Sequence, residues 1–175
     1  MKVKSVKGKV NGGTSGGNLE LNDITGAIEL ETSGGDIRAN NIFGKLFMET
    51  SGGDIKISDV KGDVDVNTSG GNVVLSSIEG KVRAETSGGN ITVKVLESNK
   101  GIYAETSGGN INIMLPKNIS ATVDASTSGG EVTCDYPIAM KGKLDESRIR
   151  GTVNGGGNPI HAHTSGGNIW IRGIE

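Results

Sequence analysis

Aliphatic and polar residues alternate in short segments that recur along the whole chain. Alignment on a repeated threonine gives four aliphatic columns, which lie four and two residues before the threonine and five and seven residues after it. One repeat illustrates the pattern with Ile28 and Leu30 before Thr32, and Ile37 and Ala39 after it. A period of two is typical of a strand that is buried on one face. Each repeat is therefore predicted to contain two short β-strands.

The repeated threonine opens the tetrad Thr-Ser-Gly-Gly, which occurs eight times in 175 residues, at spacings of 18 residues, then 20, 21 and 37. A fixed period of this kind indicates a repeat architecture. The strand alternation breaks at Ser-Gly-Gly, so we expect a corner there, with glycines in the positive φ range of a tight turn. The tetrads begin at Thr14, Thr32, Thr50, Thr68, Thr86, Thr106, Thr127 and Thr164.

Stacked repeats can bury an apolar face that a single repeat leaves exposed. The sequence predicts an all-β, single-stranded parallel β-helix (β-solenoid) of about nine rungs of roughly 18 residues, stacked about 4.8 Å apart. The usual hand of parallel crossovers favours a right-handed coil. We expect one β-solenoid domain over residues 1–175.

The pattern slips after Cys134, which itself falls in an inward column and is expected to be a core thiol. We expect a distorted rung, with a projecting loop or hairpin, at about 135–157, followed by a C-terminal rung at 158–175. Trp170 in that rung could cover the open edge of the stack, because terminal rungs need protection from further pairing.

Composition narrows the functional classes. The net charge is -2 with mixed signs, which does not favour nucleic-acid binding. Only 3% of residues are aromatic, so stacked aliphatic side chains must form the core. No apolar run has transmembrane length, and the first ten residues lack the hydrophobic centre of a signal peptide. Nothing in the sequence calls for a cofactor.

The motif Thr-Ser-Gly-Gly-[Asn/Asp]-Ile, with the ending Arg150-Gly151-Thr152-Val153-Asn154-Gly155-Gly156-Gly157, resembles the "adhesin" repeat domains of bacteria and archaea. These form a Thr-Ser-Gly-Gly β-solenoid family of unknown function. The resemblance covers nearly the whole chain. It implies a right-handed β-helix without established enzymatic activity, often exported or attached to a membrane anchor. An extracytoplasmic or cell-surface location is therefore an expectation from the resemblance.

Carboxylates flank the predicted tetrad corner on two neighbouring rungs and form a weak candidate edge for a hard cation such as Ca²⁺. The alternative is a solvated edge balanced by Arg38 and Lys56, and it is favoured, so no metal site is predicted. Asn72, Asn90 and Asn110, from the column four residues after the threonine, are expected to form a hydrogen-bonded ladder. The candidate acids are Glu31, Asp36, Glu49 and Asp54.

Exposed aromatic residues are weak candidates for ligand binding, because such rings stack on sugars or anchor proteins. The candidates are Phe47, Tyr103 and Trp170, with isolated surface rings as the alternative. His161 and His163 share an outward face without a third metal ligand. No catalytic residues are predicted.

We therefore expect a non-enzymatic binding or scaffolding module of the cell envelope, adhesin-like, whose partner is a cell-wall polysaccharide or an envelope protein. The alternative is a self-associating rod that stacks through its terminal rungs. A carbohydrate-active enzyme is less favoured, since it would need long loops that form an acidic cleft.

Overall fold

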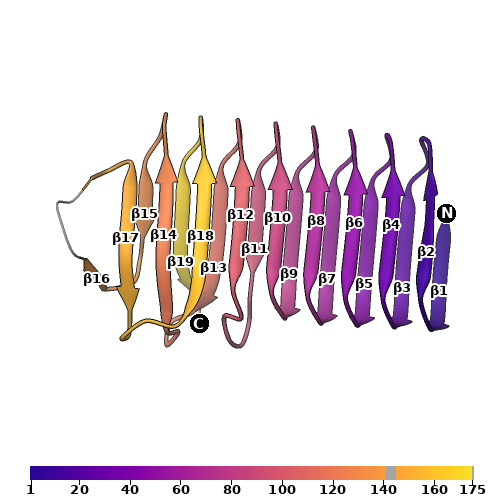
Figure 1. The fold of residues 1–175 in the computed structure, drawn as a ribbon, viewed down its shortest axis with the longest axis horizontal. Helices are drawn as coiled ribbons and strands as arrows, with labels where there is room; N and C mark the ends of the chain where they lie inside the picture. The colour runs from indigo at the N-terminus through magenta and orange to yellow at the C-terminus, as the bar shows by residue number, and fades with distance from the viewer. Residues whose placement is uncertain (141–144, 175) are drawn as a thin grey trace.

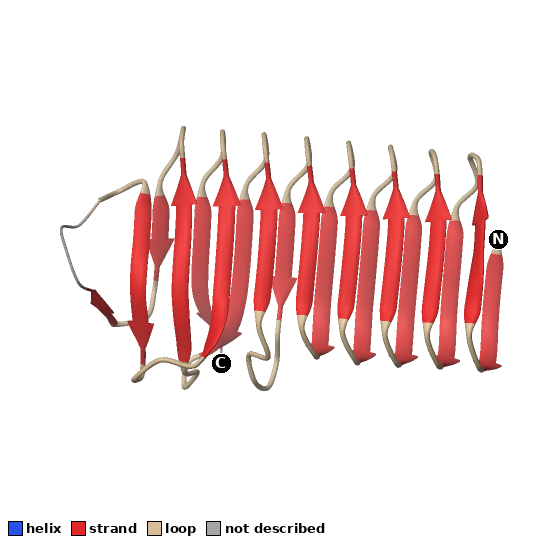
Figure 2. Cartoon of the chain, in the orientation of Figure 1, coloured by secondary structure: helices blue, strands red, loops and turns tan. Residues whose placement is uncertain are grey.

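Two parallel β-sheets form the protein, and the computed structural model describes residues 1–140 and 145–174 (Figure 1, Figure 2). Sheet A contains, in spatial order, β1 (Lys2–Lys7), β3 (Leu19–Thr25), β5 (Ile37–Phe43), β7 (Ile55–Lys61), β9 (Val73–Glu79), β11 (Ile91–Lys94), β13 (Ile111–Pro116), β19 (Ile169–Ile174) and β15 (Val132–Cys134). Sheet B contains, in spatial order, β16 (Ile138–Met140), β17 (Arg148–Val153), β14 (Ala121–Thr127), β18 (Asn158–Thr164), β12 (Ile102–Thr106), β10 (Val82–Thr86), β8 (Val64–Thr68), β6 (Leu46–Thr50), β4 (Ile28–Thr32) and β2 (Val10–Thr14).

Each rung consists of one strand of sheet B, a tetrad corner and one strand of sheet A. Equivalent residues stack in register, so that Val64 of β8 pairs with Leu46 of β6 and with Val82 of β10. In Figure 1 the nearer strands of sheet B run upward and the farther strands of sheet A run downward while the chain advances to the left, which is a right-handed coil. The predicted all-β solenoid is confirmed.

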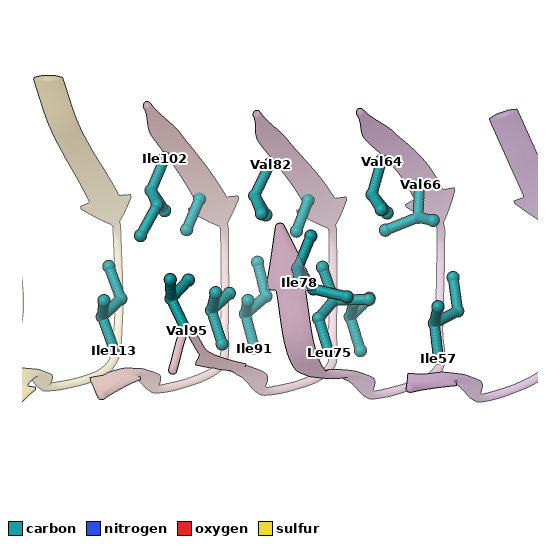
Figure 3. Packing of buried hydrophobic residues seen from close by; sticks show 14 of the residues in the cluster. Ile57, Val64, Val66, Leu75, Ile78, Val82, Ile91, Val95, Ile102 and Ile113 are labelled. Carbon is teal, nitrogen blue, oxygen red and sulfur yellow. The ribbon is translucent and has the colours of Figure 1, made fainter. Parts of the chain in front are cut away.

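The core is the space between the two sheets, and the aliphatic columns fill it. Leu75, Val93 and Ile113 from neighbouring strands of sheet A are fully buried, and side chains of both sheets point toward each other (Figure 3). A stack of identical columns lets each side chain pack on its equivalents above and below, which small aliphatic residues do without voids.

The last rung of the chain lies inside the stack and does not end it. The first six tetrad rungs stack in sequence order, but β18 then pairs with both β12 and β14. In sheet A, β19 likewise lies between β13 and β15. Residues 158–174 thus separate two rungs that are consecutive in sequence. The expectation that this rung ends the stack, with Trp170 covering its edge, is wrong, because both edges of β19 are paired.

The end of the rod is covered by an antiparallel hairpin, in the stretch for which a distorted rung with a projecting loop or hairpin was predicted. Strand β17 pairs antiparallel with β14, and β16 pairs antiparallel with β17. There are accordingly eight tetrad rungs, and the predicted ninth rung is this hairpin. Residues 141–144, which belong to the predicted loop, and Glu175, which belongs to the predicted last rung, lie outside the described residues.

A threonine hydroxyl and a closely packed glycine build each tetrad corner. Thr68 is 1% exposed, accepts a hydrogen bond from the Gly71 N–H at 3.3 Å and donates one to the Gly53 carbonyl of the preceding rung at 3.0 Å. A Cβ on Gly71 would lie 1.9 Å from that same carbonyl oxygen. The corner is where the sequence predicted it, but the reason given for its glycines is wrong. The tetrad glycines are required by the close approach of stacked backbones, and none has a positive φ in the left-handed range.

Positive φ angles occur at two other columns. The first is the glycine at the corner that leads from each sheet A strand to the next sheet B strand, as at Gly44 with φ 148°. Glycine tolerates this region because it has no Cβ. The second column was not predicted from the sequence and lies within the sheet A strands. Its residues have small polar side chains, several of a type that tolerates the left-handed conformation. Its members are Ser5, Asp23, Asn41, Asp59 and Ser77, with φ between 54° and 57°.

Candidate functional site

A shallow groove of about 840 Å³ runs along the outer face of sheet B. Its floor is the outward-facing column three residues before each tetrad threonine, and its wall is the corner where each sheet B strand begins. Strands β4, β6, β8, β10, β12 and β18 of sheet B each contribute at least one residue. Parallel in-register stacking is what joins these residues into one continuous surface. The floor of the groove contains Glu29, Phe47, Asp65, Arg83, Tyr103 and His161.

Tyr103 is held on both sides by its neighbours in the column. Its ring stacks on His161 with centroids 4.9 Å apart, and the Arg83 guanidinium carbon lies 4.6 Å from the centroid of the Tyr103 ring. The phenol hydrogen-bonds Glu105, and this bond, together with burial, raises the pKa of Tyr103. The phenol is therefore neutral and rigidly placed, and because His161 and Arg83 cover the two faces of the ring, it offers its edge to the groove.

Phe47 lies in the same groove, three strands of sheet B away from Tyr103. Three strand spacings correspond to about 14 Å along the rod. Between the two rings, Asp65 faces Arg83 at 4.0 Å, and burial raises the pKa of Asp65. The predicted ligand candidates Phe47 and Tyr103 thus lie in one groove, with ion-pairing groups between them.

Lysines form the wall of the groove along the strand-start corner. Lys9 is 3.1 Å from Glu29. Lys45, Lys81 and Lys100 are exposed and form no salt bridge within the described part of the chain. Their ammonium groups are therefore available to a ligand that lies in the groove.

Trp170, the third aromatic candidate, lies on sheet A and does not face this groove. It pairs with Asn112 of β13 and Thr133 of β15, and the Arg172 guanidinium carbon is 5.4 Å from the centroid of its ring. The structure therefore brings together two of the three aromatic candidates and separates the third.

The acidic residues proposed as a cation edge are divided between two rows. Asp36 and Asp54 belong to a ladder in which each side-chain oxygen accepts the backbone N–H of the next residue in the column, as from Asp54 to Asp36 at 3.1 Å. Arg38 also contacts Asp36 at 2.9 Å. Glu31 and Glu49 stand on the outer face of sheet B, where they pair across β4 and β6.

The predicted amide ladder is confirmed, and its order follows the spatial order of the rungs. Asn110 accepts from the Asn168 N–H, and Asn168 in turn accepts from the Glu131 N–H. No group of three or more His, Cys, Asp or Glu residues within residues 1–140 and 145–174 could hold a metal ion.

The remaining candidates from the sequence, His163 and Cys134, contact neighbouring strands or the core. His163 Nδ1 is 3.0 Å from the Ser126 hydroxyl, on neighbouring strands. Cys134 is only half-buried at the end of β15 and packs against the core, so the prediction of a core thiol holds only in part. Burial raises the pKa of the Cys134 thiol, and a neutral thiol is a poor nucleophile.

Sequence reasoning missed that His161 belongs to the groove. Along the chain it is two repeats after Tyr103, but the inserted rung makes their strands neighbours. β12 and β18 share the same inward sequence of isoleucine, alanine and threonine, which could have suggested this pairing. The inward residues of β14 are similar, however, so this pattern does not show which of β14 and β18 is the partner of β12.

The Toastrack DUF4097 family model matches residues 2–172 of the chain. Comparison with curated proteins finds no match, and comparison with solved structures finds none either. None of the described residues forms a helix that is long and apolar enough to cross a membrane. The resemblance inferred from the tetrads is therefore correct at the level of a repeat β-solenoid family of unknown function, while the family model does not support the adhesin designation. The chain belongs to the Toastrack DUF4097 family.

Proposed function

We propose that the protein is a non-catalytic binding module that holds an extended polysaccharide chain in the groove of sheet B. The observation that carries this proposal is the presence of Phe47 and Tyr103 in one groove, with polar and charged side chains between them. A sugar ring can stack its C–H face on Phe47 and pack against the edge of Tyr103, and its hydroxyls can donate to carboxylates.

The shape of the groove supports a long and flexible ligand over a small one. Small-molecule sites are concave and bury most of their ligand, whereas this groove is shallow and extends over several rungs. A polymer can make the same weak contact repeatedly along such a face, and repetition raises its overall affinity. A polysaccharide of the cell envelope fits this description, and such a ligand would place the domain at the cell surface.

Calorimetric titration of the full chain with soluble polysaccharides tests the proposal. The expected effect of Phe47→Ala and of Tyr103→Ala is about tenfold weaker binding for each. Phe43→Ala is the matched control, because Phe43 is 45% exposed and lies outside the groove. Equal weakening by Phe43→Ala would contradict the role of the groove, as would the absence of binding to any polysaccharide.

Self-association is the second candidate, and an unpaired edge favours it. Strands β1 and β2 end the sheets at one end of the rod, whereas β16 and β17 cover the other end. Pairing of two β1–β2 edges would produce a dimer, whereas growth into a longer rod would also need the edges of β15 and β16 at the hairpin end. Lys2 and Lys4 on that edge oppose pairing by like charge. Sedimentation at increasing concentration distinguishes this candidate, since a binding module stays monomeric.

A further inference from the structure

We propose that the ligand of the sheet B groove is an acidic polysaccharide with one carboxylate per disaccharide. This inference rests on the proposed function and adds the ligand class. Three properties of the groove carry it: the spacing of its lysines, the placement of its aromatic rings relative to them, and an acidic row on the opposite side of the same face.

Three of the four lysines of the wall recur on every second rung, and Lys100, on the rung after that of Lys81, stands outside this spacing. Lys9, Lys45 and Lys81 occupy the same column, five residues before the tetrad threonine, and all three line the groove. Two rung spacings amount to about 10 Å, which is close to the length of a disaccharide. A ligand with a negative group on every second sugar would therefore meet Lys45 and Lys81 in turn, and would meet Lys9 in competition with Glu29.

The two intervening rungs carry no free cation at this column. Ala27 stands between Lys9 and Lys45. Asp63 stands between Lys45 and Lys81, and its carboxylate accepts the backbone N–H of Lys81 at 3.0 Å. A ligand with a negative group on every sugar would place one of them against Asp63, and this contact between like charges is unfavourable.

Aromatic rings and lysines occur together on the floor and wall of the groove. Phe47 is two residues after Lys45 on the same rung, so a sugar on Phe47 lies beside the Lys45 ammonium. Tyr103, fixed between Arg83 and His161, gives a second ring near Lys100. Stacking on Phe47, edge contact with Tyr103 and ion pairs to the lysines would then act on the same chain.

Four of the eight residues in the other outward column of sheet B are glutamates, and these keep an anionic chain on the lysine side. These residues lie directly before the tetrad threonines, on the same face as the groove but nearer the opposite corner. Glu85 and Glu105 are engaged by Arg83 and Tyr103, whereas Glu31 and Glu49 are exposed and form no salt bridge to another described residue. Repulsion from these glutamates would determine where and in which orientation an anionic chain binds, and would add little to its affinity.

Titration of the full chain with four defined polymers tests the inference. The probes are hyaluronan oligosaccharides with a carboxylate on every second sugar, oligogalacturonate with one on every sugar, neutral chitin oligosaccharides, and a glycerol phosphate polymer. We expect hyaluronan oligosaccharides to bind most tightly, and their affinity to fall as salt screens exposed charges. The double variant Lys45→Gln/Lys81→Gln is expected to lose about tenfold in affinity.

Lys56→Gln/Lys94→Gln is the matched control, because it removes the same charge from β7 and β11 on sheet A. It should change the affinity less than twofold. Equal binding of chitin oligosaccharides, with no effect of Lys45→Gln/Lys81→Gln, would overturn the acidic class but leave the polysaccharide module intact. Tightest binding of oligogalacturonate would overturn the spacing argument, and tightest binding of the phosphate polymer would overturn the carboxylate. If none of the four binds, the proposed function falls as well.

Discussion

The rings of Tyr103 and His161 stack with centroids 4.9 Å apart and planes inclined by 16°. Their strands β12 and β18 are neighbours only because the last rung of the chain lies inside the solenoid. Arg83 approaches the same tyrosine ring from β10. This arrangement fixes the tyrosine ring in the groove before any ligand arrives, and a preorganised contact reduces the entropic cost of binding.

The Tyr103–His161 stack should contribute measurably to stability. In a double-mutant cycle with Tyr103→Leu and His161→Leu, we expect a coupling free energy of unfolding of about 1 kcal/mol, as for other aromatic pairs. Urea denaturation of the four proteins provides the measurement. A coupling energy near zero would show that the stack contributes nothing beyond the area that each ring buries.

The buried threonine hydroxyl at each tetrad corner should contribute strongly to the free energy of unfolding. Thr68→Val keeps the shape of the side chain but leaves the Gly71 N–H and the Gly53 carbonyl without their partner. The expected loss is about 2–3 kcal/mol in the free energy of unfolding, because both groups are removed from water. Ser69→Ala, at an exposed neighbouring position, should change it by less than about 0.5 kcal/mol. Similar losses for the two variants would refute the corner role of the hydroxyl.

Alanine substitutions of the two glycines in one tetrad should have very different effects on the free energy of unfolding. A Cβ at Gly71 would lie 1.9 Å from a backbone oxygen of the rung below, whereas the nearest atom to a Cβ at Gly70 is 3.8 Å away. Gly71→Ala must push two rungs apart and should destabilise the protein by more than about 4 kcal/mol or prevent folding. Gly70→Ala should be nearly neutral in thermal denaturation. Equal melting temperatures for the two variants would contradict the close-approach explanation.

Tyr136 should make stability depend on alkaline pH. Its side chain is 7% exposed, its hydroxyl donates to the Leu115 carbonyl at 2.7 Å, and burial raises its pKa from 10.0 to about 12. Because the folded-state pKa lies above the unfolded value, the contribution of the phenol is complete below pH 10 and disappears as pH rises from 10 to 12. Urea denaturation across this range should show a steeper decline for the native chain than for Tyr136→Phe. Parallel curves would show that the phenol does not titrate this way.

The inserted rung should hold the hairpin end of the rod in place. Removal of residues 158–175 eliminates β18 and β19, which connect β12 and β13 to β14 and β15. Since rungs of a solenoid are stabilised by their neighbours, we expect amide hydrogen exchange to become fast in β14 and β17 but to stay slow in β4 to β9. Removal of residues 1–9 takes away only edge strand β1 and should leave both regions protected. Retained protection of β14 in the first truncation would mean that 121–134 can pair directly with the sixth rung.

The sequence by itself determined the repeating unit. Alternating aliphatic columns, an 18-residue period and a buried threonine at a fixed position leave stacked strands as the only way to bury the apolar face. Ladders such as Asp54 to Asp36 were also predictable, because a residue repeated in every rung must contact its own equivalents.

Only the tertiary structure decided the order of the rungs and the composition of the groove. Rungs 121–134 and 158–174 present the same aliphatic column to β12, so the repeat pattern does not specify which of them pairs with it. The hairpin decides this, because antiparallel pairing of β17 with β14 occupies one edge of β14 and leaves the other for β18. Once that pairing exists, His161 stacks on Tyr103. This contact in the groove joins two residues that are far apart along the chain.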